Sequence, residues 1–167
     1  GLELVIQAAA RIRDYKDVVI LLVGDGTEKP RLMEMTNELA LNNVVFQPFV
    51  SREDYESLLK EMDVGLVCLS SMNRTPVVPG KLLSYMAAGI PVLALLNRES
   101  DGHQVIIEAE CGYSCVSDNP STASELMLKM YDAKDTLKTL GENGHRYAVS
   151  NFSRESCVNV LEEALRR

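Results

Sequence analysis

Short, uniformly apolar runs alternate with segments of helical periodicity along this chain, and this alternation limits its fold more than any other feature. Residues 18–23 and 91–96 are continuous apolar runs, which are typical of strands buried on both faces. Residues 2–14 and 79–89 instead place their apolar side chains on one helical face. Strands that alternate with helices pair in parallel through right-handed crossovers. The sequence therefore predicts an α/β fold, a doubly wound parallel sheet with helices on both faces.

The order of the expected elements runs from a first helix through five strands to a helical end. Strands are expected at residues 18–23, 44–46, 64–68, 91–96 and 112–116. Helices fill the intervals, and the side chains of Thr27, Ser51 and Ser153 are expected to cap three of them. Two further helices, near 136–150 and 154–166, exceed what one sheet needs. We expect them to pack against a neighbour outside this chain.

Composition excludes several classes of protein. The chain has 167 residues, 46% hydrophobic and 25% charged, which is ordinary for one globular domain. Its formal net charge of −7 disfavours a protein that coats nucleic acid or anionic lipid. The four cysteines form no CxxC pair, so reduced thiols are expected rather than a disulfide framework or a zinc site. No apolar run approaches the roughly 20 residues of a membrane span.

The carboxyl edge of the predicted sheet is where a ligand is expected, because open α/β sheets bind ligands beyond the ends of their strands. The segments at this edge are Gly24–Gly26, Gln47–Val50, 69–78 and 97–102. The glycines of the first segment allow a ligand to approach the backbone closely. The alternative is a plain turn before a helix.

A proline-started helix at the same edge is the second candidate. Pro79 at the helix start is expected to leave the amides of Gly80, Lys81 and Leu82 free. Free amides and the helix dipole bind anions, and Lys81 adds a full positive charge. Free amides and a positive charge are what a bound diphosphate requires. An ordinary helix with a solvated lysine is the alternative reading.

The sequence offers little support for nucleophilic catalysis. The two histidines, His103 and His145, lie outside any motif of a hydrolase or a metalloprotease. His103 lies on the ligand edge, where a ligand contact or a place on the surface are both open. His145 is expected to be structural.

Four motifs occur in order and together resemble a known family. They are Val23–Gly26, Val45–Val50, Met62–Leu66 and Pro79–Val92. This series resembles the C-terminal, donor-binding domain of glycosyltransferase group 1 enzymes (family 4), which have the GT-B fold. The resemblance implies that residues 1–167 are a single Rossmann-like, nucleotide-sugar-binding domain of a larger two-domain enzyme. It also implies that a first strand and an N-terminal acceptor domain lie upstream.

The same resemblance implies where the donor binds. The glycine turn would lie near the donor, the segment after the second strand would pack around the nucleobase, and the helix start would hold the diphosphate. The residues implied in donor binding are Gly24, Asp25, Gly26, Gln47, Phe49, Val50, Pro79, Gly80, Lys81, Leu82, Leu83 and Ser84. The family usually carries two glutamates eight positions apart, but here those positions are Val77 and Ser84. Ser84 would offer the ribose a single, weaker hydrogen bond.

The implied reaction transfers a sugar from a nucleotide diphosphate, with UDP favoured, to an acceptor hydroxyl with retention of configuration. It implies no metal and no cofactor, and it suits surface polysaccharide or glycoconjugate synthesis in the cytoplasm or at the inner face of the membrane. The family's Arg/Lys pair lies upstream of this chain, so we expect the chain alone to be inactive.

Two other functions stay open at this point. The missing glutamates fit a nucleotide-binding or interaction module that has lost transferase activity. A GT-B epimerase acting on UDP-N-acetylglucosamine is the third reading, although such enzymes need more carboxylates and histidines than this half supplies.

Overall fold

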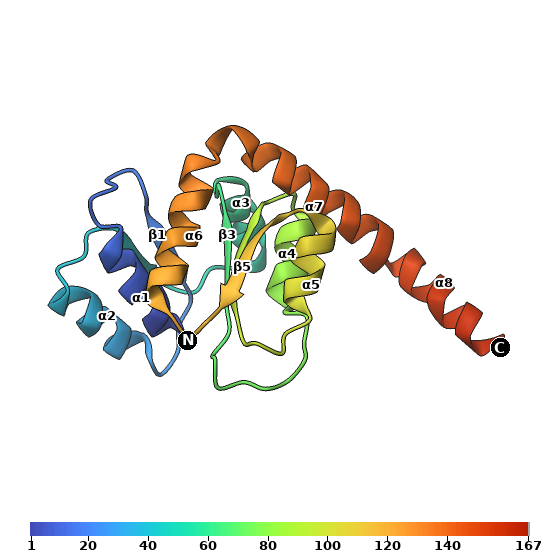
Figure 1. Cartoon of the computed structure of the whole chain (residues 1–167), viewed down its shortest axis with the longest axis horizontal. Helices are drawn as coiled ribbons and strands as arrows, with labels where there is room; N and C mark the ends of the chain where they lie inside the picture. Colours follow the sequence, from blue (N-terminus) through green and yellow to red (C-terminus); the bar gives the residue numbers. More distant parts are fainter. Residues whose placement is uncertain (167) are drawn as a thin grey trace.

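The computed structural model describes residues 1–166, and its elements follow the expected order (Figure 1). The strands are β1 (Ile20–Val23), β2 (Val44–Gln47), β3 (Gly65–Cys68), β4 (Val92–Leu96) and β5 (Gly112–Val116). The helices are α1 (Leu2–Arg11), α2 (Lys29–Glu38), α3 (Arg52–Lys60), α4 (Gly80–Ala87), α5 (Gly102–Ala109), α6 (Pro120–Asp132), α7 (Leu137–Phe152) and α8 (Arg154–Leu165). A 3-10 turn, Lys134–Thr136, precedes α7. The predicted alternation of helix and strand is confirmed.

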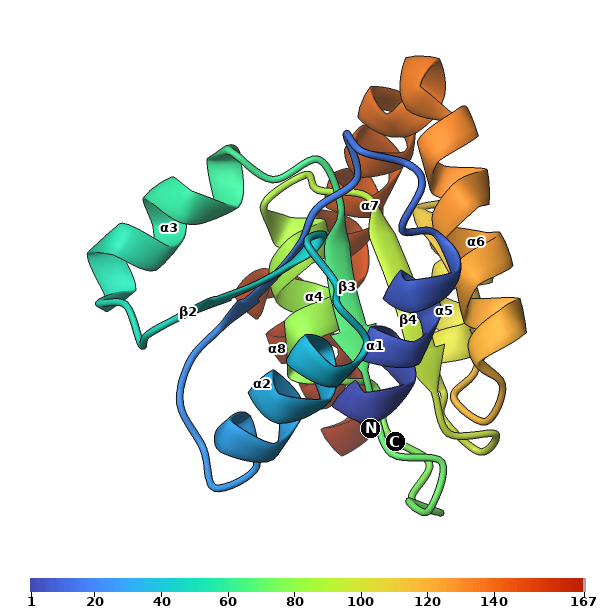
Figure 2. The same cartoon turned by 90° about the vertical axis from the view of Figure 1, so that its left-hand side faces the viewer.

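The strand pairs are parallel, as predicted. β1 pairs with β2, and β4 lies between β3 and β5, so the backbone hydrogen bonds form a two-stranded and a three-stranded ladder. Figure 2 shows β1, β2 and β3 together beside α1 and α2. Within each ladder the carboxyl ends of the parallel strands lie at the same edge, so the loops after β1 and β2 lie together, as do the loops after β3, β4 and β5.

β4 holds the two helical layers together, because all five of its residues are buried. Leu93 and Leu95 belong to the core shared with α1 and α6, whereas Val92, Ala94 and Leu96 belong to the core shared with α4 and α5. Figure 1 shows these helix pairs on opposite sides of the strands. A strand whose alternate side chains enter two separate cores has to be apolar throughout, as the sequence predicted.

Some expected boundaries and caps are wrong. β1 begins at Ile20 rather than at residue 18, because the Val18 amide donates to the Tyr15 carbonyl in a turn and Val19 is 60% exposed. Thr27 does not cap α2, which begins at Lys29 after Glu28 and has no side-chain cap among the described residues.

Other expected caps are confirmed. Ser51 accepts a hydrogen bond from the Asp54 amide at the start of α3, and Ser153 accepts one from the Ser156 amide at the start of α8. These caps satisfy amides that a helix start otherwise leaves unpaired.

The two trailing helices differ in their packing. The expectation that both pack outside this chain is wrong for α7, which lies against α4, and a Cβ at Gly141 would stand 2.0 Å from the carbonyl oxygen of Gly89 in the turn after α4. α8 extends away from the body of the molecule (Figure 1), and none of its described residues is buried. Within residues 1–166, no helix combines the length and the apolar character needed to cross a bilayer. All four cysteines are free thiols, and Cys157 is exposed.

Replacement of Gly112 by alanine should destabilise the fold. Gly112 pairs with Val92 at the start of the β4–β5 ladder, has a φ of +156°, and would place a Cβ 1.8 Å from the Val92 carbonyl oxygen. We expect Gly112→Ala to lower the free energy of unfolding by at least about 2 kcal/mol, measured by urea denaturation. Gly26→Ala is the matched control, because no described atom lies within 4 Å of its added Cβ. Equal stability of the two variants would contradict this account of the ladder.

Candidate functional site

The glycine turn follows β1 directly at the carboxyl edge. Gly24 has a φ of +132°, a conformation that favours glycine, and its amide donates to the Gln47 carbonyl at 3.2 Å. Asp25 and Gly26 are exposed. The turn is therefore joined to the end of β2 while its own surface faces solvent.

The segment after β2 lies beside this turn. The Phe49 amide donates to Asp25 Oδ2 at 3.1 Å, and the Phe49 side chain is 76% exposed. Gln47 is exposed and Val50 is half-buried. The residues expected around a nucleobase therefore come together with the glycine turn, and an aromatic ring stands free beside them.

Lys29 joins the two segments, and the sequence analysis missed it. Its ammonium donates to the Gly24 carbonyl at 2.8 Å, to Asp25 Oδ1 at 2.9 Å and to the Gln47 carbonyl at 3.0 Å. The only signal in the sequence is an Asp followed by a Lys four positions later across a helix start. Two of the three acceptors are backbone carbonyls, which sequence patterns do not reveal.

The start of α4 leaves two backbone amides free. Pro79 is buried and extended, with φ −63° and ψ 132°. Among residues 1–166, no hydrogen-bond acceptor meets the amides of Gly80 or Lys81. Gly80 is exposed, and no described atom lies within 4 Å of the position its Cβ would take. This end of the helix is therefore open to a ligand.

One part of the expectation for α4 is wrong. The Leu82 amide is not free, because it donates to the Pro79 carbonyl at 3.0 Å. Two amides rather than three are therefore free at this helix start.

The other residues expected along α4 divide between surface and core. The Lys81 side chain is exposed, Leu82 is fully buried and Leu83 is half-buried. Ser84 is exposed, and its hydroxyl donates to the Gly80 carbonyl at 3.0 Å. Leu82 thus anchors the helix in the core and has no surface to offer a ligand.

The loop before α4 is held by the loop after β4. Asn97 Nδ2 donates to the Thr75 carbonyl at 3.3 Å, and Ser100 Oγ donates to the Val77 carbonyl at 2.6 Å. Both side chains are buried. Their contacts fix the direction in which the chain enters α4.

Both histidines hold the fold together. His103 is half-buried, with Nδ1 2.8 Å from Ser114 Oγ and Nε2 3.2 Å from the Asn97 carbonyl. Both of its ring nitrogens are therefore engaged within the protein. His145 Nδ1 lies 2.8 Å from the Ala87 carbonyl at the end of α4, which fits the structural role expected for it.

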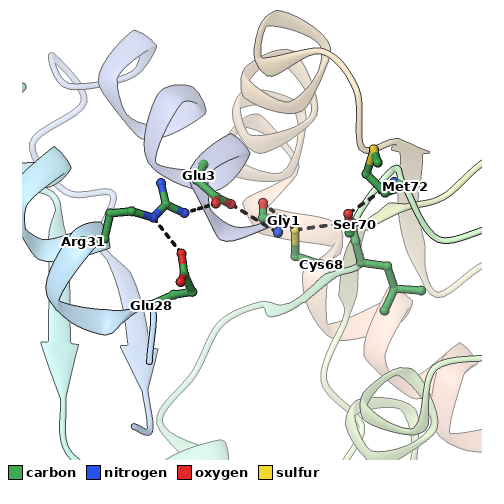
Figure 3. Close-up of polar contacts among 8 residues, drawn as sticks. Gly1, Glu3, Glu28, Arg31, Cys68, Ser70 and Met72 are labelled. Carbon is green, nitrogen blue, oxygen red and sulfur yellow. Dashed lines mark hydrogen bonds and ion pairs between the residues drawn. The ribbon is translucent and has the colours of Figure 1, made fainter. Parts of the chain in front are cut away.

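Carboxylates near this edge are paired with a cation (Figure 3). Arg31 contacts both Glu3 and Glu28, and the Cys68 thiol donates to the Gly1 carbonyl. The backbone amide of Glu3, followed by Arg31, lowers the pKa of Glu3 to about 2. The N-terminus of α1 is thereby fixed at the end of β3.

The clearest hollows of the surface lie elsewhere. A shallow hollow of about 440 Å³ is lined by Ala87–Gly89, Glu142, His145 and Arg146, at the opposite end of α4 from Gly80. The carboxyl edge is an open surface of loops. It is one wall of a site rather than an enclosed pocket.

The Asp25–Lys29 pair should make the stability of the fold depend on pH. The Lys29 ammonium, and next the Phe49 amide, hold the pKa of Asp25 below its usual value of 3.8. Such a pair stabilises the fold above about pH 4, and its contribution is lost as the pH falls through the folded-state pKa. We expect Lys29→Met to raise the pKa of Asp25, measured by a carboxyl NMR titration. Lys138→Met, which removes the exposed Lys138–Glu142 pair, is the control. An unchanged Asp25 pKa in Lys29→Met would show that the pair is absent in solution.

Comparisons with known proteins agree with this architecture. The family model described as "Glycosyl transferases group 1" matches residues 1–147. The N-acetyl-alpha-D-glucosaminyl L-malate synthase of Bacillus anthracis is 25% identical over 95% of this chain and 40% of its own length, so the chain spans about two fifths of that relative.

Solved structures share the fold. HepE of Anabaena, crystallised in complex with UDP, has a TM-score of 0.80 at 22% identity, over 99% of this chain and 45% of that chain. The C-terminal domain of the group 1 glycosyl transferase LpcC of Francisella tularensis has a TM-score of 0.75 at 16% identity, over 92% of this chain and 80% of that chain. The chain therefore belongs to the glycosyl transferases group 1 family and has the fold of the C-terminal domain of GT-B enzymes.

Proposed function

We propose that residues 1–167 form the donor-binding domain of a retaining glycosyltransferase that uses a UDP-sugar. The observation that carries this proposal is the open start of α4, where the amides of Gly80 and Lys81 are free and Gly80 is exposed. The residues that we assign to donor binding are the twelve named in the sequence analysis. Leu82 has a different role among them, because it anchors α4 in the core and donates no free amide.

The start of α4 suits the chemistry of the leaving group. As the glycosidic bond breaks, negative charge develops on the diphosphate. Backbone amides at a helix N-terminus stabilise that charge without reorganising, and the helix dipole adds to their effect. The exposed ammonium of Lys81 lies one residue into the helix and would supply a full charge. Gly80 allows the phosphate oxygens to reach the backbone.

The neighbouring segments suit a nucleoside. The glycine turn and the Gln47–Val50 segment form one surface, and the exposed Phe49 ring offers an apolar face to a base. UDP is supported over other nucleotides by the family resemblance and by HepE, which has the same fold and was crystallised with UDP.

The complete reaction needs more than this chain. We place the acceptor domain, the upstream Arg/Lys pair and the general base in the rest of a longer protein, as the partial coverage of the relatives supports. On this proposal the full-length enzyme works in the cytoplasm or at the inner face of the membrane, in polysaccharide or glycoconjugate synthesis. The chain alone binds the donor without turning it over.

One observation favours a second function. The positions of the family's two glutamates carry no carboxylate here, and the Ser84 hydroxyl is engaged by the Gly80 carbonyl. A nucleotide-binding module without transferase activity fits this loss. A full-length protein that binds a UDP-sugar but neither transfers nor hydrolyses it would identify that module.

UDP binding tests the proposal directly. We expect the chain to bind UDP with a dissociation constant between about 10 μM and 1 mM, because only one wall of the cleft is present. In a titration followed by amide NMR, the resonances of residues 24–26, 47–50 and 79–84 should shift. No shift at millimolar UDP would contradict the proposal.

The variant Gly80→Val sharpens this test. The added side chain has open space, so the fold should persist, but it crowds the two free amides. We expect UDP binding to weaken by at least about tenfold, the equivalent of one lost charge-assisted hydrogen bond. Ser121→Val is the matched control, because it changes the start of α6, a helix with a proline in its first turn whose start is capped by the Asn119 side chain. Equal losses in both variants would argue against a phosphate at α4.

Lys81→Ala tests the charge at this site in the full-length enzyme. If Lys81 faces the diphosphate, KM for the UDP-sugar should rise roughly three- to tenfold, and the difference should shrink at high salt. Lys138→Ala, an exposed lysine of α7, should leave KM unchanged. A Lys81→Ala enzyme with the wild-type KM would place this lysine in solvent.

A further inference from the structure

Lys29 occupies a position that the stability of its own helix does not explain. It is the first residue of α2, where the helix dipole favours anions and disfavours cations. Its side chain is nevertheless only 22% exposed and is turned back towards the strands. An ammonium group has three N–H donors, and all three meet an acceptor. The cation is therefore held by the two loops and not by α2.

These acceptors complete a closed ring of contacts. The Gln47 carbonyl accepts from both the Gly24 amide and Lys29, while Asp25 accepts from Lys29 through one oxygen and from the Phe49 amide through the other. The ring joins the end of β1 to the end of β2 just where their backbone ladder stops at Val23 and Gln47. Past that point, Lys29 and Asp25 continue the connection with side chains.

We propose that Lys29 is a positioning residue for the nucleotide: it fixes the glycine turn against the Gln47–Val50 segment, so that both stand ready before the ligand arrives. This inference rests on the proposed function, because it assigns the ready-made surface to the nucleoside of UDP. When the surface is ordered before the ligand binds, the binding free energy does not have to offset the entropy lost in ordering two loops. Lys29 itself touches no ligand, and its charge is already satisfied by Asp25.

The experiment compares variants of the 167-residue chain in two measurements. Lys29→Met keeps the length of the side chain but removes all three donors, Asp25→Asn removes the charge of the partner, and Lys29→Arg keeps the cation. Lys138→Met is the matched control, since it breaks an exposed i,i+4 pair far from the carboxyl edge. Thermal melts show that each variant is folded. The measurements are the hydrogen exchange rate of the Phe49 amide without ligand, and the dissociation constant for UDP.

We expect Lys29→Met to speed exchange of the Phe49 amide roughly tenfold and to weaken UDP binding at least about fivefold. Asp25→Asn should change the Phe49 exchange rate and the UDP affinity in the same direction but by less. Lys29→Arg should retain part of the slow exchange and part of the UDP affinity. Lys138→Met should match the wild type. A general loss of stability would speed exchange throughout the chain, whereas the proposal requires a change confined to the two loops.

Two outcomes overturn the inference, and they differ from failure of the proposed function. If the wild type binds UDP and Lys29→Met binds it within twofold as well, Lys29 does not position the nucleotide. Faster Phe49 exchange with unchanged UDP binding also overturns it, because the loops would then loosen without any effect on the ligand. If the wild type does not bind UDP, the proposed function itself fails, and the role of Lys29 towards a nucleotide fails with it.

Discussion

The burial of β4 on both faces is the constraint on which the rest of this structure depends. Its alternate side chains enter two separate cores, so helices have to cover each side, and the helical crossovers that do so connect it to β3 and β5 as parallel neighbours. Parallel strands deliver their loops to one edge. The glycine turn and the Gln47–Val50 segment lie at the ends of the separate β1–β2 ladder, and the loop that follows β3 leads into α4.

On the proposed function, a chain of net charge −7 would have to bind the diphosphate through local features. Two features of the carboxyl edge provide them. The free amides at α4 carry partial positive charge that does not depend on the net charge of the protein. Three of the nearby carboxylates are paired: Asp25 with Lys29, and both Glu3 and Glu28 with Arg31. Pairing limits the repulsion that these acids would exert on a diphosphate.

Much of the fold followed from periodicity, whereas contacts between distant segments did not. The order of helices and strands, the parallel pairing and the Ser51 and Ser153 caps were predictable, because each depends on neighbours in sequence or on one buried face. The Thr27 cap was wrong, since α2 starts two residues later than Thr27. The prediction of a free Leu82 amide was wrong, because this amide donates to the Pro79 carbonyl.

Lys29 was missed altogether, because its acceptors include the carbonyl groups of Gly24 and Gln47, and every residue has a carbonyl. The glycine turn and the proline-started helix were visible because they depend on residues with unusual backbone preferences.

A crystal structure of the chain grown with UDP is the most direct test of the central claim. We expect the diphosphate oxygens within hydrogen-bond distance of the Gly80 and Lys81 amides, with the uracil beside Gly24–Gly26 and Phe49. A diphosphate bound elsewhere, for example in the hollow beside His145 and Arg146 at the far end of α4, would contradict it.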